Sequence, residues 1–252
     1  MKNLVEIYEK TIEEYPDEYV PILVANKSRI IWQIRQVLDK CKPGGHLLDI
    51  GAGIVPFMYI CSKLGYNTTI VDDFADDTYQ SAGTDEVLGL FREQGVSVKA
   101  GNTFSDDLSF ISEDIYDLIT SHDSMEHWHN SPKNMFHTLW GNISPSGLLW
   151  IGVPNCVNLR KRITVPFGYG KWSAMEDWYE KPEFRGHVRE PDVADLKYIS
   201  EDLGASRYEI IGKNWLGYRN PSKLIRNVTP FVDNFLQLRP SLCSDINLFA
   251  WK

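Results

Sequence analysis

The apolar and polar residues of the chain follow two different periods. Short apolar runs bounded by glycine or polar residues predict buried strands at 46–50, 67–71, 96–100, 116–120, 148–153, 208–211 and 246–250. Apolar residues spaced three and four apart predict helices at 3–15, 27–40, 55–64, 84–94, 132–143 and 192–203. Alternating strands and helices indicate a parallel sheet with helices on both faces. We expect one α/β domain over residues 1–252, with N-terminal helices within residues 1–40.

The alternation stops at residues 155–190, which show no clean period and are rich in aromatic and cationic side chains. A stretch of this length inside a compact domain usually carries function. We interpret it as an insertion or lid on the ligand side of the sheet. The alternative is a loop whose aromatic residues form a small core of their own. Later in the chain, Pro230 and Pro240 interrupt the apolar segment before the last strand.

Composition excludes several classes of protein. The chain has 43% hydrophobic and 24% charged residues, as ordinary globular proteins do. Its net charge of -8 argues against a broad electropositive surface for nucleic acid or an anionic membrane, and leaves open a local basic patch. No apolar run reaches the roughly 20 residues of a transmembrane helix, and the N-terminus lacks a signal-peptide core. The 4 cysteines form no CxxC pair. We expect a cytoplasmic protein with no nucleic-acid partner and no membrane span; these patterns leave its oligomeric state open.

The strongest motif is DIGAG at 49–53, between a predicted strand and a predicted helix. Its glycines allow a ligand to approach the backbone closely. Asp72 ends the next strand, where a carboxylate can accept hydrogen bonds from ribose hydroxyls. A dinucleotide fingerprint would need glycine at position 56, where this chain has Pro56. Because Asp49 directly precedes the glycines, a cationic ligand such as S-adenosylmethionine, which carries a sulfonium and an ammonium, fits better.

The order of these motifs resembles that of class I S-adenosylmethionine-dependent methyltransferases. The matching segments are LDIGAG at 48–53, Asp72, YDLI at 116–119 with Glu126 and His127, and ISPSGL at 143–148. HVR at 187–189 is similar to the small-molecule branch of that family. The resemblance implies a doubly wound, mostly parallel seven-stranded sheet with a last antiparallel strand. It also implies an enzyme that uses S-adenosylmethionine and releases S-adenosylhomocysteine.

The resemblance further implies a set of cofactor-binding residues. They are Asp49, Gly51, Ala52, Gly53, Asp72, Asp73, Asn102, Thr103, Ser121 and His122. Asp49 and the glycines would lie at the methionine end, Asp72 at the ribose, and Asn102 at the adenine. The chain departs from the family at Val55, where many members have a small residue, and at Asn102, which replaces a carboxylate. The amide oxygen of Asn102 can still accept a hydrogen bond.

Five titratable side chains lie in SHDSMEHWH at 121–129, after the fourth strand. Methyl transfer mainly requires alignment and exclusion of water, but an oxygen acceptor also loses a proton to a general base. We expect His127, then Asp123, then His122, as that base; alternatively, the Glu126–His127 pair only caps and packs a helix. Asp123, Glu126 and His127 also resemble the acidic-acidic-His pattern of ubiquinone-biosynthesis O-methyltransferases, which implies a cation such as Mg²⁺. We expect no metal here.

The chemical class of the methyl acceptor is inferred mainly from a motif that the chain lacks. N-methylating relatives that act on adenine or glutamine carry an Asn/Asp-Pro-Pro-aromatic motif, where this chain has SHDS at 121–124. We therefore expect O-methylation of a small metabolite or of a glycan sugar hydroxyl. The acceptor would enter at 155–190, where aromatic and cationic residues suit such ligands. Alternatives are a non-catalytic S-adenosylmethionine-binding or scaffold protein and a small-molecule N-methyltransferase. A nicotinamide oxidoreductase is disfavoured by Pro56.

Overall fold

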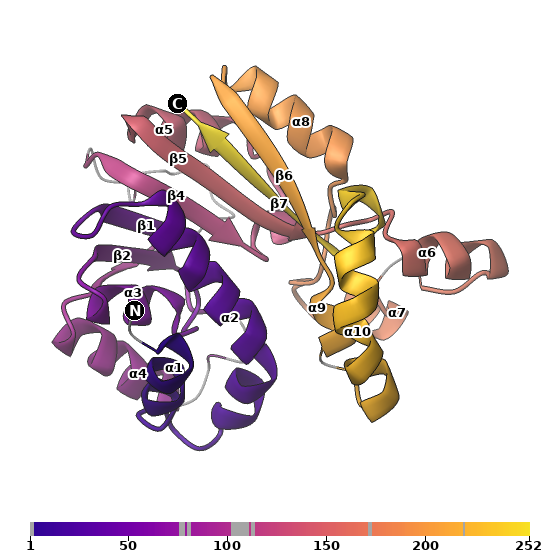
Figure 1. Ribbon diagram of the computed structural model, residues 1–252, viewed down its shortest axis with the longest axis horizontal. Helices are drawn as coiled ribbons and strands as arrows, with labels where there is room; N and C mark the ends of the chain where they lie inside the picture. The colour runs from indigo at the N-terminus through magenta and orange to yellow at the C-terminus, as the bar shows by residue number, and fades with distance from the viewer. Residues whose placement is uncertain are drawn as a thin grey trace.

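The computed structural model describes residues 3–75, 79, 82–101, 111, 114–170, 173–218 and 220–252. These residues form a seven-stranded sheet of order β3-β2-β1-β4-β5-β7-β6 (Figure 1). The strands are β1 (His46–Ile50), β2 (Asn67–Asp72), β3 (Ser97–Ala100), β4 (Tyr116–His122), β5 (Ile143–Pro154), β6 (Arg207–Lys213) and β7 (Asp245–Trp251). Strands β1 to β5 pair in parallel, and β7 is antiparallel to both β5 and β6. The predicted sheet and its antiparallel last strand are confirmed.

The helices surround this sheet (Figure 1). They are α1 (Leu4–Ile12), α2 (Val20–Lys40), α3 (Phe57–Lys63), α4 (Ala82–Glu93), α5 (Lys133–Gly141), α6 (Leu159–Thr164), α7 (Met175–Tyr179), α8 (Val193–Asp202), α9 (Trp215–Tyr218) and α10 (Lys223–Leu236). The described part of the chain also contains the 3-10 turns η2 (Met125–His127), η3 (Val165–Phe167) and η4 (Pro240–Leu242). None of the described helices is both long enough and apolar enough to cross a membrane.

Two of these helices differ from the prediction because of proline. Helix α2 begins at Val20 rather than near residue 27, since Pro21 fits the first turn of a helix, where its missing N–H costs no hydrogen bond. Helix α10 continues through Pro230, which the sequence pattern treats as an interruption. Pro230 is exposed, so the carbonyl group that it leaves without a helical donor can be hydrated.

Each face of the sheet carries its own layer of helices, because neighbouring strand residues point to opposite faces. Leu47 packs with Trp150 against α1 to α4. Leu48 packs with Leu149 against α5 and α8 on the other face. The doubly wound arrangement is therefore confirmed, and the carboxyl ends of β1, β2 and β4 meet along one edge between the two layers. Helices α6 and α10 project beyond the ends of β5 and β6 (Figure 1).

Candidate active site

The turn after β1 needs glycine for two reasons. Gly51 and Gly53 have φ values of 70° and 55°, in the left-handed region that favours glycine. A Cβ on Gly51 would also lie 2.0 Å from the Oγ of Ser124, and one on Gly53 would lie 2.3 Å from the hydroxyl of Tyr79. The backbone N–H groups of Gly51 and Ala52 donate to the Val71 carbonyl at 2.8 and 3.4 Å. The turn is thus held close to the end of β2 and to the residues after β4.

Asp72 joins this turn to the end of β2. Its Oδ2 accepts from the Gly53 N–H at 2.8 Å, and its Oδ1 accepts from the Phe74 N–H at 2.7 Å. Burial raises the pKa of Asp72 above its ordinary value, and the two backbone donors oppose that change. Each carboxylate oxygen has a second lone pair, so the group can accept further hydrogen bonds. The neighbouring Asp73 pairs with the Arg185 guanidinium at 2.9 Å.

Asp49 and His122 form a buried pair on the face of the sheet that α1 to α4 cover. Asp49 is 3% exposed, and its Oδ1 accepts from the Thr120 hydroxyl at 2.7 Å. The Nδ1 of His122 lies 4.0 Å from the same oxygen. Burial raises the pKa of Asp49 to about 7, whereas burial lowers the pKa of His122 to about 3. A positive charge bound nearby would favour the ionised form of Asp49.

Two consecutive residues at the end of β4, which point to opposite faces of the sheet, each bury a polar atom without a partner. The Nε2 of His122 and the Oγ of Ser121 make no hydrogen bond to the described residues. Buried polar atoms are normally paired, so a polar ligand at the end of β4 could pair with either atom. The His122 ring is fixed by edge-on packing against Trp150, at 4.4 Å between centroids, and against Phe57.

The Asp123 carboxylate binds a residue of the N-terminal helices rather than a neighbour in sequence. Its φ of 48° is unusual for a residue other than glycine. Its carboxylate forms an ion pair with Arg29 of α2, a side chain that is 14% exposed. The sequence pattern does not indicate this contact, because 94 residues separate the partners.

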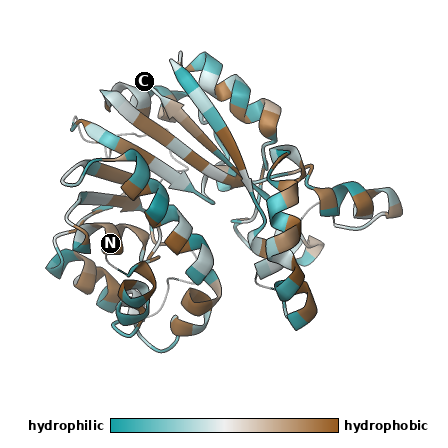
Figure 2. Cartoon of the chain, in the orientation of Figure 1, coloured by the Kyte–Doolittle hydropathy of each residue, from teal (hydrophilic) through white to brown (hydrophobic). Residues whose placement is uncertain are grey.

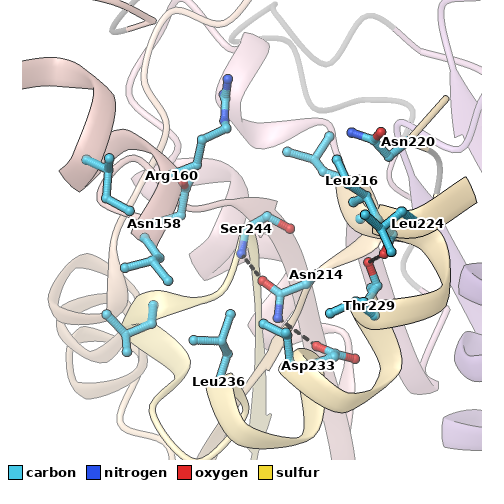
Figure 3. A pocket seen from close by; sticks show the side chains of 17 residues that line it. Asn158, Arg160, Asn214, Leu216, Asn220, Leu224, Thr229, Asp233, Leu236 and Ser244 are labelled. Carbon is cyan, nitrogen blue, oxygen red and sulfur yellow. Dashed lines mark hydrogen bonds between the residues drawn. The ribbon is translucent and has the colours of Figure 1, made fainter. Parts of the chain in front are cut away.

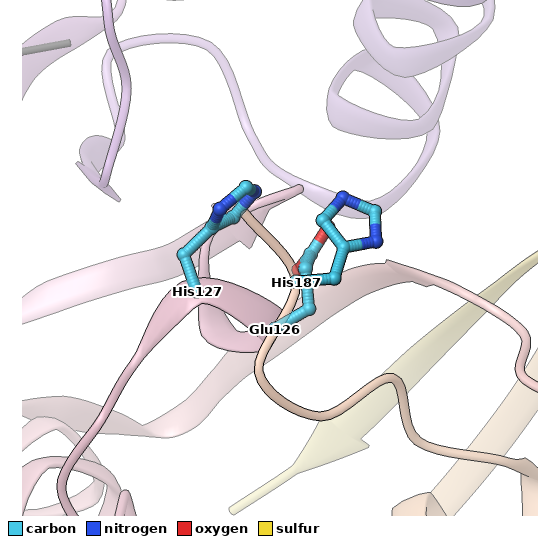
Figure 4. A group of neighbouring side chains, drawn as sticks. All are labelled: Glu126, His127 and His187. Carbon is cyan, nitrogen blue, oxygen red and sulfur yellow. The ribbon is translucent and has the colours of Figure 1, made fainter. Parts of the chain in front are cut away.

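Glu126, His127 and His187 lie together beside the end of β4 (Figure 4). One potential ligand atom from each lies within 4.8 Å of the others, so the group could hold a divalent ion. Glu126 is fully buried, and neither carboxylate oxygen has a partner among the described residues. Burial and the nearby Asp123 raise the pKa of Glu126 well above its ordinary value. Asp123, the third member of the predicted Mg²⁺ pattern, is absent from this group.

Each histidine of the group is oriented through its Nδ1 atom. The Nδ1 of His127 donates to the Arg185 carbonyl at 2.6 Å; because a carbonyl can only accept, the basic nitrogen of the neutral ring is Nε2. The Nδ1 of His187 lies 2.8 Å from Oε1 of Glu190. Hydrogen bonds from the His187 and Lys161 side chains lower the pKa of Glu190 to about 2 against the effect of its burial. Glu190 is therefore a carboxylate at neutral pH.

Residues 185–189 cross the carboxyl edge of the sheet. The backbone N–H groups of Val188 and Arg189 donate to the Glu126 carbonyl at 2.7 and 3.2 Å. At the other end, Arg185 pairs with Asp73 after β2. Since β1 lies between β2 and β4 in the sheet, this segment passes across the end of β1, where the glycine turn lies.

A cavity of about 440 Å³ adjoins this segment. It is lined by His129, Ser173, Met175, Trp178, Phe184, His187 and Val188. Among the described residues from 159 to 190, no side chain is buried, so the aromatic residues do not form a core of their own. Two of these aromatic residues, Trp178 and Phe184, instead line a cavity that the imidazoles of His129 and His187 also border.

Two predicted cofactor residues, Asn102 and Thr103, lie outside the described residues. The other eight lie along the carboxyl edge of β1, β2 and β4. Sequence reasoning missed Arg29 and included Arg185 only among the cationic residues of the stretch at 155–190; the partners of both are distant in the chain. It noted His187 only as part of a motif; the nearby Glu190, at the helical spacing i, i+3, was the local signal that could have indicated an oriented imidazole.

A family model described as a methyltransferase domain matches residues 25–206. The chain belongs to this family. No curated protein matches the sequence. The methyltransferase shares its fold with solved structures of low sequence identity. One is a cyclopropane-fatty-acyl-phospholipid synthase-like protein from Lactobacillus casei, with a TM-score of 0.64, 13% identity, and coverage of 100% of this chain and 99% of that chain.

Two further similar structures are described as S-adenosylmethionine-dependent methyltransferases. The protein from Mesorhizobium loti has a TM-score of 0.58 and 14% identity, with 90% of this chain and 98% of that chain covered. The protein from Archaeoglobus fulgidus has a TM-score of 0.55 and 18% identity, with 88% and 92% covered. The predictions of a class I methyltransferase fold, of an enzyme and of S-adenosylmethionine as its cofactor are confirmed.

The residues at the carboxyl edge fit this cofactor. The glycine turn leaves no room for a side chain at position 51, because the Ser124 side chain already fills the space that a Cβ would take. Asp72 can accept more hydrogen bonds than the two that it receives, and Asp49 can balance a positive charge. At the same edge, Ser121 and His122 each have a buried polar atom that is available to hydrogen-bond a polar ligand.

Proposed function

We propose that this methyltransferase transfers a methyl group from S-adenosylmethionine to a hydroxyl group of a small metabolite or a glycan sugar. The observation that carries the proposal is the pair of oriented imidazoles, His127 and His187, beside an aromatic-lined cavity at the same sheet edge as the glycine turn. A sugar or aromatic ring fits such a wall, and an oriented imidazole can take a hydroxyl proton.

In this proposal the cofactor supplies an activated methyl group at its sulfonium. Asp49, Gly51, Ala52 and Gly53 border the methionine end, and Asp49 balances the positive charge. Asp72 and Asp73 serve the ribose end. Ser121 and His122 offer the polar atoms that lack partners. Asn102 and Thr103 remain the residues proposed for the adenine.

His127 is the general base that this arrangement favours. The Arg185 carbonyl keeps a proton on Nδ1 and thereby presents Nε2 as the acceptor of a hydroxyl proton. Asp123 ranks lower because Arg29 engages its carboxylate. His122 ranks last because a pKa of about 3 makes its ring a weak base. The insertion at 155–190 is proposed to admit the acceptor and exclude water.

The test is to replace His127 by alanine and follow S-adenosylhomocysteine release with a panel of sugar, phenol and amine acceptors. Turnover should fall by roughly 10²–10⁴-fold, the usual contribution of a general base, while calorimetric affinity for S-adenosylmethionine stays unchanged. His137→Ala on α5 is the matched control, since that histidine pairs with Asp202 away from the site. A near-wild-type rate for His127→Ala removes this residue from the mechanism.

The same panel separates the alternatives. Methylation of amines but of no hydroxyl would replace the proposal with a small-molecule N-methyltransferase. Cofactor binding without release of S-adenosylhomocysteine for any acceptor would favour a binding or scaffold protein.

A further inference from the structure

Helices α6 and α10, with η3 between α6 and α7, expose an unusually large number of apolar side chains. We refer to the exposed residues of these three elements and the adjoining Leu238 as the α6–α10 surface. Phe231, Phe235 and Leu238 are 78%, 72% and 81% exposed, and Phe167 of η3 is 75% exposed. Figure 2 shows hydrophobic residues along both projecting helices. Soluble monomers rarely expose a contiguous apolar patch of this kind without a binding role.

The apolar residues of α10 follow one side of the helix. Leu224, Val228, Phe231, Phe235 and Leu238 are spaced four, three, four and three residues apart, which places them on one face. The opposite face is fixed to the domain, because Asp233 is 4% exposed and its Oδ1 accepts from the Asn214 amide at 2.6 Å. The apolar side of α10 is therefore held facing outward.

An apolar cavity of about 640 Å³ lies between the two helices (Figure 3). Leu224, Ile225, Val228 and Val232 of α10 line it together with Ile163 of α6. Its volume is in the range of ligand-binding cavities, and its walls suit hydrocarbon. The exposed surface is thus a hollowed apolar face rather than a flat one.

The exposed charged residues within the elements of this surface have one sign. Residues 159–170 and 220–242 contain six cationic residues (Arg160, Lys161, Arg162, Lys223, Arg226 and Arg239) and one acidic residue, Asp233, in a chain of net charge -8. The only acid is the buried Asp233 that holds α10 in place. Arg160, Lys223 and Arg239 form no ion pair with any acidic side chain among the described residues. A helix with a broad apolar side and cationic residues beside it is typical of binding at an anionic membrane interface.

We propose that the α6–α10 surface docks this protein on an anionic phospholipid bilayer. Phe231, Phe235 and Leu238 enter the boundary of the acyl chains, and Arg160 and Lys223 meet lipid phosphates. A second copy of this chain fits the surface less well, because an isologous contact would bring two identical cationic sets together. Arg160 and Phe167 also belong to the 155–190 insertion that we propose admits the acceptor, but the test below measures vesicle binding, which requires neither an acceptor nor turnover.

Docking would also orient the enzyme. Helix α6 follows the carboxyl end of β5, and α9 and α10 follow that of β6. The edge of the sheet that carries the glycine turn would then lie next to the bilayer.

The test is sedimentation of the full-length protein with vesicles of phosphatidylglycerol and phosphatidylcholine, compared with vesicles of phosphatidylcholine alone, at low and high salt. We expect binding to the anionic vesicles that weakens as salt increases. Each cation near an anionic surface contributes about fivefold to the partition coefficient, so Arg160→Ala with Lys223→Ala should reduce it by about 25-fold. Phe231→Ser with Phe235→Ser should reduce it by at least about tenfold.

The matched control is Tyr198→Ser on α8, an aromatic residue that is 69% exposed elsewhere on the protein. It should bind vesicles as the unsubstituted protein does. The proposal is overturned if the protein ignores anionic vesicles at low salt, or if Tyr198→Ser loses binding equally. It is also overturned if sedimentation equilibrium shows a dimer that Phe231→Ser with Phe235→Ser converts to a monomer. Circular dichroism of each variant confirms that it is folded.

Discussion

Replacing Asp49 by asparagine should stabilise the cofactor-free methyltransferase and weaken its affinity for S-adenosylmethionine. Burial raises the pKa of Asp49 to about 7, from an ordinary value of 3.8. At 1.36 kcal/mol per pKa unit, this difference corresponds to about 4 kcal/mol of unfolding free energy lost on ionisation. Asparagine carries no charge to desolvate, and its amide oxygen can still accept from the Thr120 hydroxyl.

The pH dependence of this gain has a definite sign. Below pH 3.8 Asp49 is protonated in the folded and unfolded states, so its substitution changes little. As the pH rises from 3.8 to about 7, the unfolded chain ionises first and the wild type loses stability relative to Asp49→Asn. The difference should be near zero below pH 4 and about 4 kcal/mol at pH 8. His122, with a pKa of about 3, is neutral at pH 8 and does not contribute there.

Urea unfolding at pH 4, 6 and 8 measures the stability difference, and calorimetry measures binding. In the wild type, affinity for S-adenosylmethionine relative to S-adenosylhomocysteine should rise as the pH passes through about 7, because the ionised Asp49 favours the sulfonium. In Asp49→Asn this ratio should be flat. A variant that is less stable than the wild type at pH 8, or a stability difference that does not change with pH, would refute the reasoning.

Two further predictions concern the glycine turn and whether methyl transfer requires a metal ion. Gly51→Ala should lower affinity for S-adenosylmethionine by at least about tenfold, because its Cβ would lie 2.0 Å from Ser124 Oγ. The matched control is Gly65→Ala, because Gly65 also has a positive φ, of 94°, but no atom lies within 4 Å of its Cβ position. This variant should lose about 1 kcal/mol of stability without a change in affinity. Equal losses of affinity in both variants would show that the clash with Ser124 is not the cause. Dialysis against EDTA should leave S-adenosylhomocysteine formation unchanged, since His127 as base requires no metal. A loss that Zn²⁺ or Mn²⁺ restores would instead assign Glu126, His127 and His187 to a metal site.

The sheet could be predicted because its signals are local. The β1 and β2 segments are apolar runs that end at glycine or aspartate, and the structure places β1 at the residues expected. Strand β5 begins at Ile143 rather than 148, because pairing with Tyr116 extends it through a segment whose Pro145 and Gly147 read as a turn. The outward apolar side of α10 was also missed, since Pro230 obscures its helical period.

From sequence, only the part of the candidate site that borders the glycine turn after β1 could be predicted. Asp49, Gly51 and Asp72 follow two adjacent parallel strands, so topology alone brings them together. The ion pair of Asp123 with Arg29 and the approach of His187 to Glu126 depend on tertiary contacts between distant segments. The protonation states of Asp49 and His122 also could not be predicted. Their opposite pKa changes arise from desolvation, which depends on burial in the folded structure and not on the local sequence.

The segment at 185–189 has a kinetic consequence. It is fastened at one end by two backbone hydrogen bonds to Glu126 and at the other by the ion pair of Arg185 with Asp73. In the proposed arrangement the cofactor lies beneath this segment, so exchange of spent for fresh cofactor should disturb one of these attachments, and the ion pair is the one that dissolved ions screen. When this exchange limits the cycle, added electrolyte should therefore accelerate turnover, whereas it should leave a rate limited by methyl transfer unchanged.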